Sequence, residues 1–357
     1  LALTVDGFTA DNKVYDGNRT AVVAGTMTNK VDGDTLTLIG IFSDKNVADG
    51  KTVTGGLSGT DAGNYSLTKT TTANITPLAL TVDGFTADNK VYDGNRTATV
   101  TGTMTNKVDG DTLTLIGTFS DKNVADGKTV TGGLSGTDAG NYTLSKTAIA
   151  NITPLALTVD NFAADNKVYD GNRTAAVSGT MSNKVSTDDL SLTGTFSDKN
   201  VADGKTVTGG LSGTDAGNYS LTKTTTANIT PLALTVDGFT ADNKVYDGNR
   251  TAVVAGTMTN KVDGDTLTLT GTFSDKNVAD GKTVTGGLSG TDAGNYSLTK
   301  TTTANITPLA LTVDGFTADN KVYDGNRTAV VAGTMTNKVD GDTLTLIGTF
   351  SDKNVAD

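Results

Sequence analysis

Gly59-Thr60-Asp61-Ala62-Gly63-Asn64-Tyr65 is the stretch that decides the fold of this chain. Its Asp-Ala-Gly-Asn-Tyr portion recurs unchanged at residues 138–142, 215–219 and 292–296. An Asp-x-Gly-x-Tyr group between two alternating strands is typical of the corner where one strand of a β-sandwich crosses to the next. In such a corner the tyrosine hydroxyl bonds back to the main chain of the corner, and glycine allows the tight crossing. We therefore predict that Asp61, Gly63 and Tyr65 are structural corner residues.

The corner belongs to a tandem repeat. Leu1-Ala2-Leu3-Thr4-Val5 recurs at residues 78, 155, 232 and 309, which is a period of 77 residues. This period suits one small domain per copy better than a helical solenoid. We predict repeats at 1–77, 78–154, 155–231 and 232–308, with a partial fifth copy at 309–357. Cutting the period at Gly50 also gives four full copies. The sequence therefore leaves open at which residue the structural unit begins, and whether strands are exchanged between copies.

The composition favours strands and turns. The 357 residues include 43 glycines and many threonines, but no Glu, Gln, His, Cys or Trp. Thr and Val fit a pleated, half-buried surface, while Gly, Asn and Asp supply turns. Only 36% of the residues are apolar. Because these apolar residues are patterned, we expect a folded chain rather than a disordered one.

Differences between the copies show which positions face outward. Val22 becomes Thr99 in the second copy, and Ile41 becomes Thr272 in the fourth, whereas Ala21 stays apolar in every copy. A position that accepts a polar residue faces solvent, and a position that stays apolar faces the core. The period of two in these exchanges predicts strands with one buried face.

The alternating segments predict about seven strands in each copy. In the first copy they include residues 1–5, 20–27, 36–42, 51–57, 65–69 and 71–76. Lys13-Val14-Tyr15 followed by Asp16-Gly17 predicts a tight hairpin that pairs with 20–27. Short strands with turn signals every 8 to 12 residues or so indicate a tandem array of small immunoglobulin-like β-sandwich domains, an all-β fold. A β-grasp-like repeat is the alternative, although no segment indicates the helix it needs.

The joint between copies is short. At Thr76-Pro77-Leu78 the inward-facing phase changes, and proline cannot donate a hydrogen bond to a sheet, so the chain passes here from one sheet to the next. Without a Gly/Ser-rich linker, successive domains are expected to hold a fixed tilt and to form a semi-rigid rod. From strand length we expect a rise of ~30–40 Å per copy.

Charge and composition exclude several classes of function. The net charge is −11, from 39 acidic and 28 basic residues. We expect no nucleic-acid partner, because no basic face could neutralise phosphates. We expect no membrane insertion, since no apolar run is long enough to cross a bilayer. Without His, Cys or Glu the common catalytic sets cannot be built, so we predict that the chain is not an enzyme and has no catalytic or cofactor-binding residues.

Asp32-Gly33-Asp34 is the candidate metal site. Carboxylates in a loop are the hard oxygen ligands that calcium requires, so calcium is the one cofactor that the sequence leaves open. An exposed turn is the alternative, because Asp and Gly are common turn residues. The third copy has Ser186 in place of the first carboxylate.

Four stretches of the period carry a resemblance to a known family. They are Lys13-Val14-Tyr15-Asp16-Gly17, the Phe-Ser-Asp-Lys-Asn-Val of 42–47, the corner at 59–65 and Ala-Asn-Ile-Thr-Pro at 73–77. With them the repeat resembles the YDG-type domain of large bacterial surface exoproteins, the filamentous-haemagglutinin-like and autotransporter-like adhesins. The resemblance implies an extracellular place on the surface of a Gram-negative bacterium and a role as a stalk between anchor and tip.

Three functions follow as hypotheses. The first is a structural stalk or fibre of an extracellular adhesin that projects a distal region from the cell, with neighbouring repeats as each domain's partners. The second is a multivalent module in which each copy binds a host glycan or surface protein weakly and repetition gives avidity. The third is a subunit of a self-assembling filament, with like chains as partners.

Overall fold

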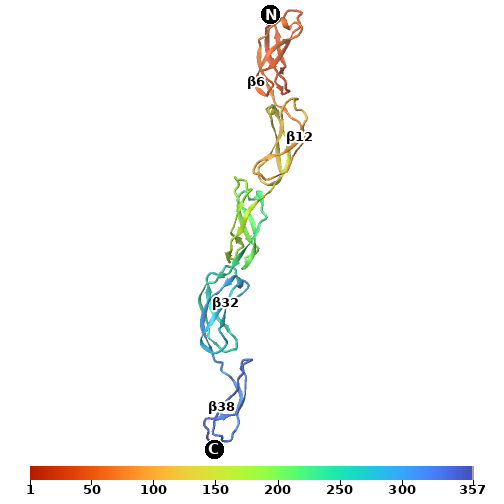
Figure 1. Ribbon diagram of the computed structural model, residues 1–357. Coiled ribbons are helices and arrows are strands. Elements are labelled where there is room, and N and C mark those ends of the chain that lie inside the picture. The colour runs from red at the N-terminus through yellow and green to blue at the C-terminus, as the bar shows by residue number, and fades with distance from the viewer. Residues whose placement is uncertain (356–357) are drawn as a thin grey trace. The chain divides into compact units, whose positions relative to one another are not determined.

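The computed structural model describes residues 1–355, which fold into strands and loops without any α-helix (Figure 1). Single 3-10 turns follow the longest strands. They are η1 (Ala62–Asn64), η2 (Ala139–Asn141), η3 (Ala216–Asn218) and η4 (Ala293–Asn295). The chain divides into two compact units: residues 1–160, 180–191 and 211–222 form one, and 161–179, 192–210 and 223–357 form the other.

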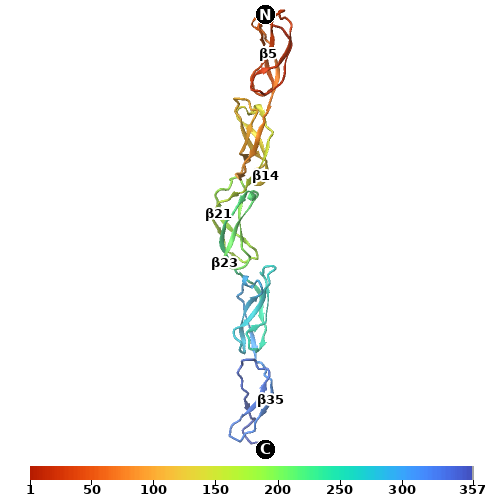
Figure 2. The same ribbon diagram turned by 90° about the vertical axis from the view of Figure 1, so that its right-hand side faces the viewer.

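The first repeat has a sheet of five strands and a sheet of two. Its strands are β1 (Val5–Ala10), β2 (Lys13–Val14), β3 (Thr20–Ala21), β4 (Val23–Met27), β5 (Thr37–Phe42), β6 (Ala48–Ser58) and β7 (Thr70–Thr76), of which β6 is labelled in Figure 1 and β5 in Figure 2. The five-stranded sheet has the order β2-β7-β6-β5-β3, and only its β2–β7 pair is parallel. The antiparallel pair β1–β4 lies against it, with β1 next to β7 and β4 next to β5.

The second, third and fourth repeats contain the same strands as the first and two further short strands each, and the fifth contains four strands. The second has β8 (Leu78–Ala79), β9 (Val82–Ala87), β10 (Lys90–Val91), β11 (Thr97–Ala98), β12 (Val100–Met104), β13 (Thr114–Phe119), β14 (Ala125–Ser135), β15 (Tyr142–Thr143) and β16 (Thr147–Thr153). The third has β17 (Leu155–Ala156), β18 (Val159–Ala164), β19 (Lys167–Val168), β20 (Thr174–Ala175), β21 (Val177–Met181), β22 (Ser191–Phe196), β23 (Ala202–Ser212), β24 (Tyr219–Ser220) and β25 (Thr224–Thr230). The fourth has β26 (Leu232–Ala233), β27 (Val236–Ala241), β28 (Lys244–Val245), β29 (Thr251–Ala252), β30 (Val254–Met258), β31 (Thr268–Phe273), β32 (Ala279–Ser289), β33 (Tyr296–Ser297) and β34 (Thr301–Thr307). The fifth has β35 (Val313–Ala318), β36 (Thr328–Ala329), β37 (Val331–Met335) and β38 (Gly348–Thr349).

The predicted fold class is confirmed. Each complete repeat is a small all-β, immunoglobulin-like sandwich of a five-stranded and a two-stranded sheet, and residues 1–355 contain no helix of the kind that a β-grasp would need. Phe42 on β5 pairs with Val53 on β6, and both side chains are fully buried. Ile41, one residue from Phe42, is 44% exposed, and Val22 is 71% exposed. The exchanges between copies therefore identified the outward face correctly.

The predicted hairpin at Asp16-Gly17 is wrong. β2 pairs in parallel with β7, so that Lys13 lies opposite Ile75, while β3 pairs with β5. The Asp16 carboxylate accepts hydrogen bonds from the Asn18 main chain and side chain and pairs with Lys13. These local bonds satisfy the turn without a second strand, so the chain crosses between sheet edges instead of folding back.

The apolar core does not stop where one repeat ends. One cluster of buried side chains joins Tyr15, Phe42 and Ile75 of the first repeat to Val82 and Tyr142 of the second. A matching cluster runs from Tyr169 in the third repeat to Tyr296 in the fourth. Each domain of this size buries little surface by itself. Because the core continues across the joint, each repeat contributes to the free energy of unfolding of its neighbour.

A bulge interrupts the β1–β4 pair between Asp6 and Thr9. Gly7 within it has φ +60°, a value that glycine adopts without steric cost. In the third repeat the same position is Asn161, with φ +53°. Asparagine is among the few side chains that tolerate this region, which explains why this exchange keeps the bulge.

Candidate functional site: the junction between repeats

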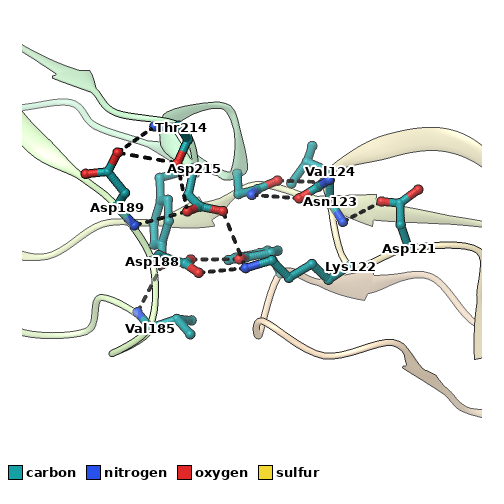
Figure 3. A network of polar contacts seen from close by, with 12 residues as sticks. Asp121, Lys122, Asn123, Val124, Val185, Asp188, Asp189, Thr214 and Asp215 are labelled. Atoms are coloured by element: carbon teal, nitrogen blue, oxygen red, sulfur yellow. Dashed lines mark hydrogen bonds and ion pairs between the residues drawn. The ribbon is translucent and has the colours of Figure 1, made fainter.

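Two loops from one repeat meet two loops from the next. In the first repeat, the far end is defined by the loops at residues 15–19 and 43–47, and the near end by the loops at 28–35 and 59–65; the other repeats have the same two ends 77 residues further on. Figure 3 shows the far end of the second repeat against the near end of the third. The contacts described next all lie within one compact unit.

Asp188 is the centre of this junction. Its side chain is fully buried, and its Oδ2 accepts the hydroxyl hydrogens of Tyr92, from the far end, and Tyr219, from its own repeat, each at 2.7 Å. Its Oδ1 accepts a hydrogen bond of 2.8 Å from Lys122 Nζ, which also comes from the far end (Figure 3). A buried carboxylate is favourable only when it is paired and hydrogen-bonded, and three donors meet that need here. Two of the three donors belong to the preceding repeat.

A second set of contacts lies beside Asp188. The Val124 main-chain N–H donates to Asn218 Oδ1 at 2.8 Å, and Asn218 Nδ2 donates to Asn123 Oδ1 at 3.2 Å. Lys122 Nζ also lies 3.4 Å from Asp215 Oδ1 (Figure 3). A main-chain bond needs correct placement of the loop as well as of a side chain. These contacts therefore hold the loops of the second repeat against the loops at 180–191 and 211–222.

Two apolar contacts close the junction. The rings of Tyr92 and Tyr219 meet edge to face, with centroids 5.5 Å apart and an angle of 71°. Aromatic pairs of this kind contribute about 0.5–1.5 kcal/mol beyond burial. A Cβ atom at Gly94 would lie 2.7 Å from Cγ1 of Val185 in the next repeat. The glycines of the first four Tyr-Asp-Gly groups, Gly17, Gly94, Gly171 and Gly248, therefore leave space for a valine of the next repeat.

The buried charge shifts the ionisation of its neighbours. Burial alone would raise the pKa of Asp188, but hydrogen bonds from Lys122, Tyr92 and Tyr219 outweigh burial and lower this pKa below its ordinary value. Burial, and then the bond to Asp188, raises the pKa of Tyr219 to about 12. The bond to Asp188 also raises the pKa of Lys122. At neutral pH the set is thus one carboxylate, one ammonium and two neutral phenols.

The same set recurs at other joints. At the first joint Asp111 accepts from Tyr15 and Tyr142 at 2.7 Å each and from Lys45 at 2.9 Å. At the third, Asp265 accepts from Tyr169 at 2.8 Å, Tyr296 at 2.6 Å and Lys199 at 3.0 Å. At the fourth, Tyr246 donates to Asp342 at 2.9 Å, Lys276 lies 3.6 Å away, and the Asp342 side chain is 20% exposed.

The predicted corner residues have related but different roles. Asp61 precedes η1, and its Oδ2 accepts from the Thr35 main chain at 2.8 Å. The Tyr65 hydroxyl accepts from the main chain of Val31, in another loop, and not from within the corner. Gly63 has open space around it, whereas Gly59, with φ +116°, would collide with the Thr35 carbonyl oxygen if it carried a side chain. Gly59 is the glycine that the crossing requires.

The two candidate calcium ligands, Asp32 and Asp34, have different environments. Asp34 accepts a hydrogen bond of 2.7 Å from the Tyr65 hydroxyl, and it is the first-repeat counterpart of Asp111 and Asp188. Asp32 is exposed in the same loop. The part of the chain that the structure describes has no group of three His, Cys, Asp or Glu side chains that could hold a metal ion. Calcium binding stays a prediction.

Sequence reasoning missed the donors of the junction. The alternation within one repeat gives no partner for Tyr15, Gly17 or Lys45, because their partners lie in the next repeat. Tyr15 and Lys45 donate to Asp111, and Gly17 lies against Val108. One signal could have revealed the acceptor. In the third copy, where the loop reads Ser186-Thr187-Asp188-Asp189, the first carboxylate is lost while Asp188 is kept. A turn needs neither carboxylate in particular, so retention of the second indicates a contact.

The arrangement holds two protein surfaces together through satisfied polar groups. Both oxygens of Asp188 are engaged by donors, and the lysine facing it is paired. Within residues 1–355, none of the side-chain polar atoms that are buried lacks a hydrogen-bond partner. In that same range no helix has the length and apolar character needed to cross a membrane.

Comparisons with known proteins agree with the repeat. The family model of the YDG domain matches residues 1–73, 76–149, 153–227, 230–304 and 307–357. No curated protein sequence matches the chain.

Solved structures with similar folds are distant. The immunoglobulin domains 1–5 of Sidekick-1 share 10% identity, over 86% of this chain and 81% of that one, with a TM-score of 0.23. The Escherichia coli adhesin FdeC shares 15%, over 76% and 96%, with a TM-score of 0.19. Drosophila N-cadherin EC1-4 shares 7%, over 84% and 98%, with a TM-score of 0.19. At such TM-scores, nothing about activity or partners follows from these likenesses.

Proposed function

Because this chain belongs to the YDG domain family, in tandem copies, we propose that it is a structural stalk of an extracellular bacterial adhesin. Its repeats act together as a stiff spacer that projects a distal functional region away from the cell surface. The role is mechanical rather than enzymatic: the number of copies sets the reach, and the joints set the stiffness.

The buried carboxylate at the first three joints is the observation that carries this proposal. Bending the joint at Asp188 would separate it from Tyr92 and Lys122 and leave a charge short of partners. Removing one partner of a buried pair costs about 3–5 kcal/mol. A flexible linker would carry no such cost. The joint therefore resists bending through the same contacts that stabilise the fold.

Small-angle X-ray scattering of the chain tests the proposal. A stiff array with a rise of ~30–40 Å per copy should give a maximum dimension of ~140–190 Å and the scattering of a thin rod. The variant Asp111→Asn/Asp188→Asn/Asp265→Asn should keep its strand content but scatter as a flexible chain. The matched control Asp109→Asn/Asp263→Asn changes exposed carboxylates in the loops of Asp111 and Asp265, and Asp32→Asn adds the equivalent carboxylate of the first repeat; this triple variant should stay rod-like. Flexible scattering by the unchanged chain would refute the stalk proposal.

A further inference from the structure

The chain enters and leaves a repeat through segments that run in the same direction. The second repeat begins with β8 and β9 and ends with β15 and β16. β8 pairs in parallel with β15, and β10, which follows β9, pairs in parallel with β16. The other strand pairs of this repeat are antiparallel, namely β9–β12, β11–β13, β13–β14 and β14–β16. The entering and leaving segments are therefore joined in parallel at two places.

The first of these places is where the chain enters the repeat. Leu78 lies opposite Tyr142 on the neighbouring strand, and Ala79 lies opposite Thr143. The Leu80 main-chain N–H donates to the Thr143 carbonyl oxygen at 2.8 Å. The side chains of Leu80 and Tyr142 are both buried, so the pairing is covered by the apolar core on one side. We call these contacts the entry clamp.

The second place is where the chain leaves the repeat. The Tyr92 main-chain N–H donates to the Thr153 carbonyl oxygen at 2.9 Å, directly after the parallel pairing of β10 with β16. The Asn89 side chain adds to this pairing, because its Oδ1 accepts the Asn151 main-chain N–H at 2.6 Å. We call these contacts the exit clamp. Each of its bonds connects the entering half of the chain to the leaving strand.

Both clamps recur in the other complete repeats. The Leu80 bond has counterparts of 2.8 Å from Leu3 to Ser66, from Leu157 to Ser220 and from Leu234 to Ser297. The Tyr92 bond has counterparts of 2.9 Å from Tyr15 to Thr76, from Tyr169 to Thr230 and from Tyr246 to Thr307. The Asn89 bond has counterparts at Asn12, Asn166 and Asn243. The two clamps are thus a property of the repeat and not of one copy.

Successive clamps are joined without slack. Between the exit clamp of the first repeat and the entry clamp of the second, Pro77 is the one intervening residue. Tyr15 of that exit clamp and Tyr142 of that entry clamp both donate their hydroxyl hydrogens to Asp111 Oδ2. A tensile force that leaves one repeat therefore reaches the entry clamp of the next directly, since no flexible linker lies between them to extend first.

We propose that each complete repeat is a tension-bearing module, whose entry and exit clamps resist a pull along the chain in shear. Pulling the two ends of a repeat apart draws its entering and leaving segments past each other in opposite directions. Main-chain hydrogen bonds run between paired strands rather than along them. All bonds of a clamp are therefore loaded together and must break in one step. An antiparallel hairpin that is pulled at its open end instead loses its bonds one at a time.

This inference goes beyond the stalk proposal, because resistance to pulling and resistance to bending are measured separately. A chain that scatters as a flexible polymer could still hold tension, and a stiff chain could still unfold at low force. Tension is measured by holding the whole chain at its two ends in optical tweezers. Each complete repeat of 77 residues should unfold in one step that lengthens the chain by about 240 Å, from ~3.6 Å per extended residue less a folded length of ~35 Å.

Two sets of asparagine substitutions test the exit clamp. The clamp variant is Asn12→Ala/Asn89→Ala/Asn166→Ala/Asn243→Ala. The control variant is Asn18→Ala/Asn95→Ala/Asn172→Ala/Asn249→Ala. Asn95 is also exposed, and its Oδ1 accepts the Thr97 main-chain N–H at 2.8 Å, but that bond stays within one loop and does not reach the leaving strand.

Forced unfolding reports the height of the unfolding barrier rather than equilibrium stability. At constant force the clamp variant should unfold about fivefold faster than the unaltered chain, the rate equivalent of one hydrogen bond in each repeat. The control variant should unfold at the rate of the unaltered chain, although both variants should lower the temperature of thermal unfolding. Equal acceleration in both variants, or in neither, would overturn the proposal.

The direction of the pull gives a second test that leaves both clamps intact. Thr114 lies opposite Ser135 at the open end of the β13–β14 hairpin. The chain has no cysteine, so the variant Thr114→Cys/Ser135→Cys places handles at these two positions alone. Pulled there, the second repeat should open at a lower force than when it is pulled end to end. Equal forces in the two directions would show that the parallel pairs do not bear the load.

Discussion

Gly17 lies so close to Val108 of the next repeat that a Cβ atom on it would stand 2.5 Å from Cγ1 of the valine. Gly17→Ala should therefore both strain the backbone, at φ +81°, and push the two repeats apart. Gly325 is its matched control, with the same φ and nothing within 4 Å. Gly325→Ala should cost only the backbone term of about 1–2 kcal/mol. Gly17→Ala should cost about 1–3 kcal/mol more.

Hydrogen exchange distinguishes the free-energy cost of backbone strain from the cost of the lost contact with Val108. The Val47 amide bonds across the first joint to Asn141, so its exchange reports opening of that joint. Gly17→Ala should speed its exchange at least tenfold, whereas Gly325→Ala should leave it unchanged. Equal exchange in both variants would mean that the valine contact contributes nothing.

Asp111→Asn should weaken the first joint by about 1.5–3 kcal/mol, because Lys45 and two phenols lose a charged hydrogen-bond partner. The Val47 amide, which bonds across the joint to Asn141, is the reporter. Asp109→Asn, at an exposed carboxylate in the same loop as Asp111, should leave the exchange of this amide unchanged. Protection that survives Asp111→Asn would show that the apolar contacts suffice.

The joint should be stable between about pH 4 and pH 10. Burial alone would raise the pKa of Asp111. Hydrogen bonds from Lys45, Tyr142 and Tyr15 outweigh burial, so this pKa lies below its ordinary value. A depressed pKa gives stability that is complete above the unfolded value of about 3.9 and is lost as pH falls through the folded value.

At the alkaline limit the pKa shift has the opposite direction to that of Asp111. Burial, and then the bond to Asp111, raises the pKa of Tyr142 to about 12. Its contribution is therefore complete below the unfolded value of about 10 and is lost as pH rises through about 12. Tyrosine circular dichroism in the near ultraviolet should show a plateau with a loss at each side. Asp111→Asn, Asp188→Asn and Asp265→Asn together should remove the acid limb, and a profile unaffected by them would contradict this assignment.

Asn161→Gly should raise the stability of the third repeat by about 0.5–1 kcal/mol. Asn161 has φ +53°, where glycine carries no steric penalty, and the other repeats have glycine there. The reverse change, Gly84→Asn, should lower stability by a similar amount in the second repeat. Thermal unfolding followed by circular dichroism measures both, and a loss on Asn161→Gly would show that the asparagine side chain makes a stabilising contact.

Chelator should leave the unfolding temperature unchanged. Asp34 is bonded to Tyr65, and at closed joints Lys45 and two tyrosines engage both oxygens of Asp111. Calcium binding at this loop would have to displace these donors. Thermal unfolding with 1 mM calcium and with excess EDTA tests this, and a clear fall with EDTA would restore the calcium hypothesis for Asp32 and Asp34.

The fold was largely predictable because its signals are local. Whether Ile41 or Phe42 faces the core depends on alternation along one strand, and differences between copies report it directly. Pairing was less predictable. Asp16-Gly17 has the composition of a hairpin turn, but the competing bonds to Lys13 and Asn18 decide its path.

The junction could not be derived from one repeat. Tyr15 and Asp111 are 96 residues apart, and nothing in the alternation of either repeat marks them as partners. Tyr65 seemed to belong to an internal corner because its hydroxyl does reach a main-chain group. At the equivalent Tyr142–Asp111 bond, the first repeat supplies a lysine and a second phenol, Lys45 and Tyr15, which only a view across the joint reveals.

Each complete copy carries one half of a joint at either end, and the same contacts of tyrosine and lysine with a buried aspartate recur between complete copies. A copy can therefore be duplicated or deleted in the gene while every remaining interface keeps its proper counterpart. Length in this protein is free to vary by whole units, so that recombination between near-identical segments changes how far the chain extends without any need to evolve a new contact.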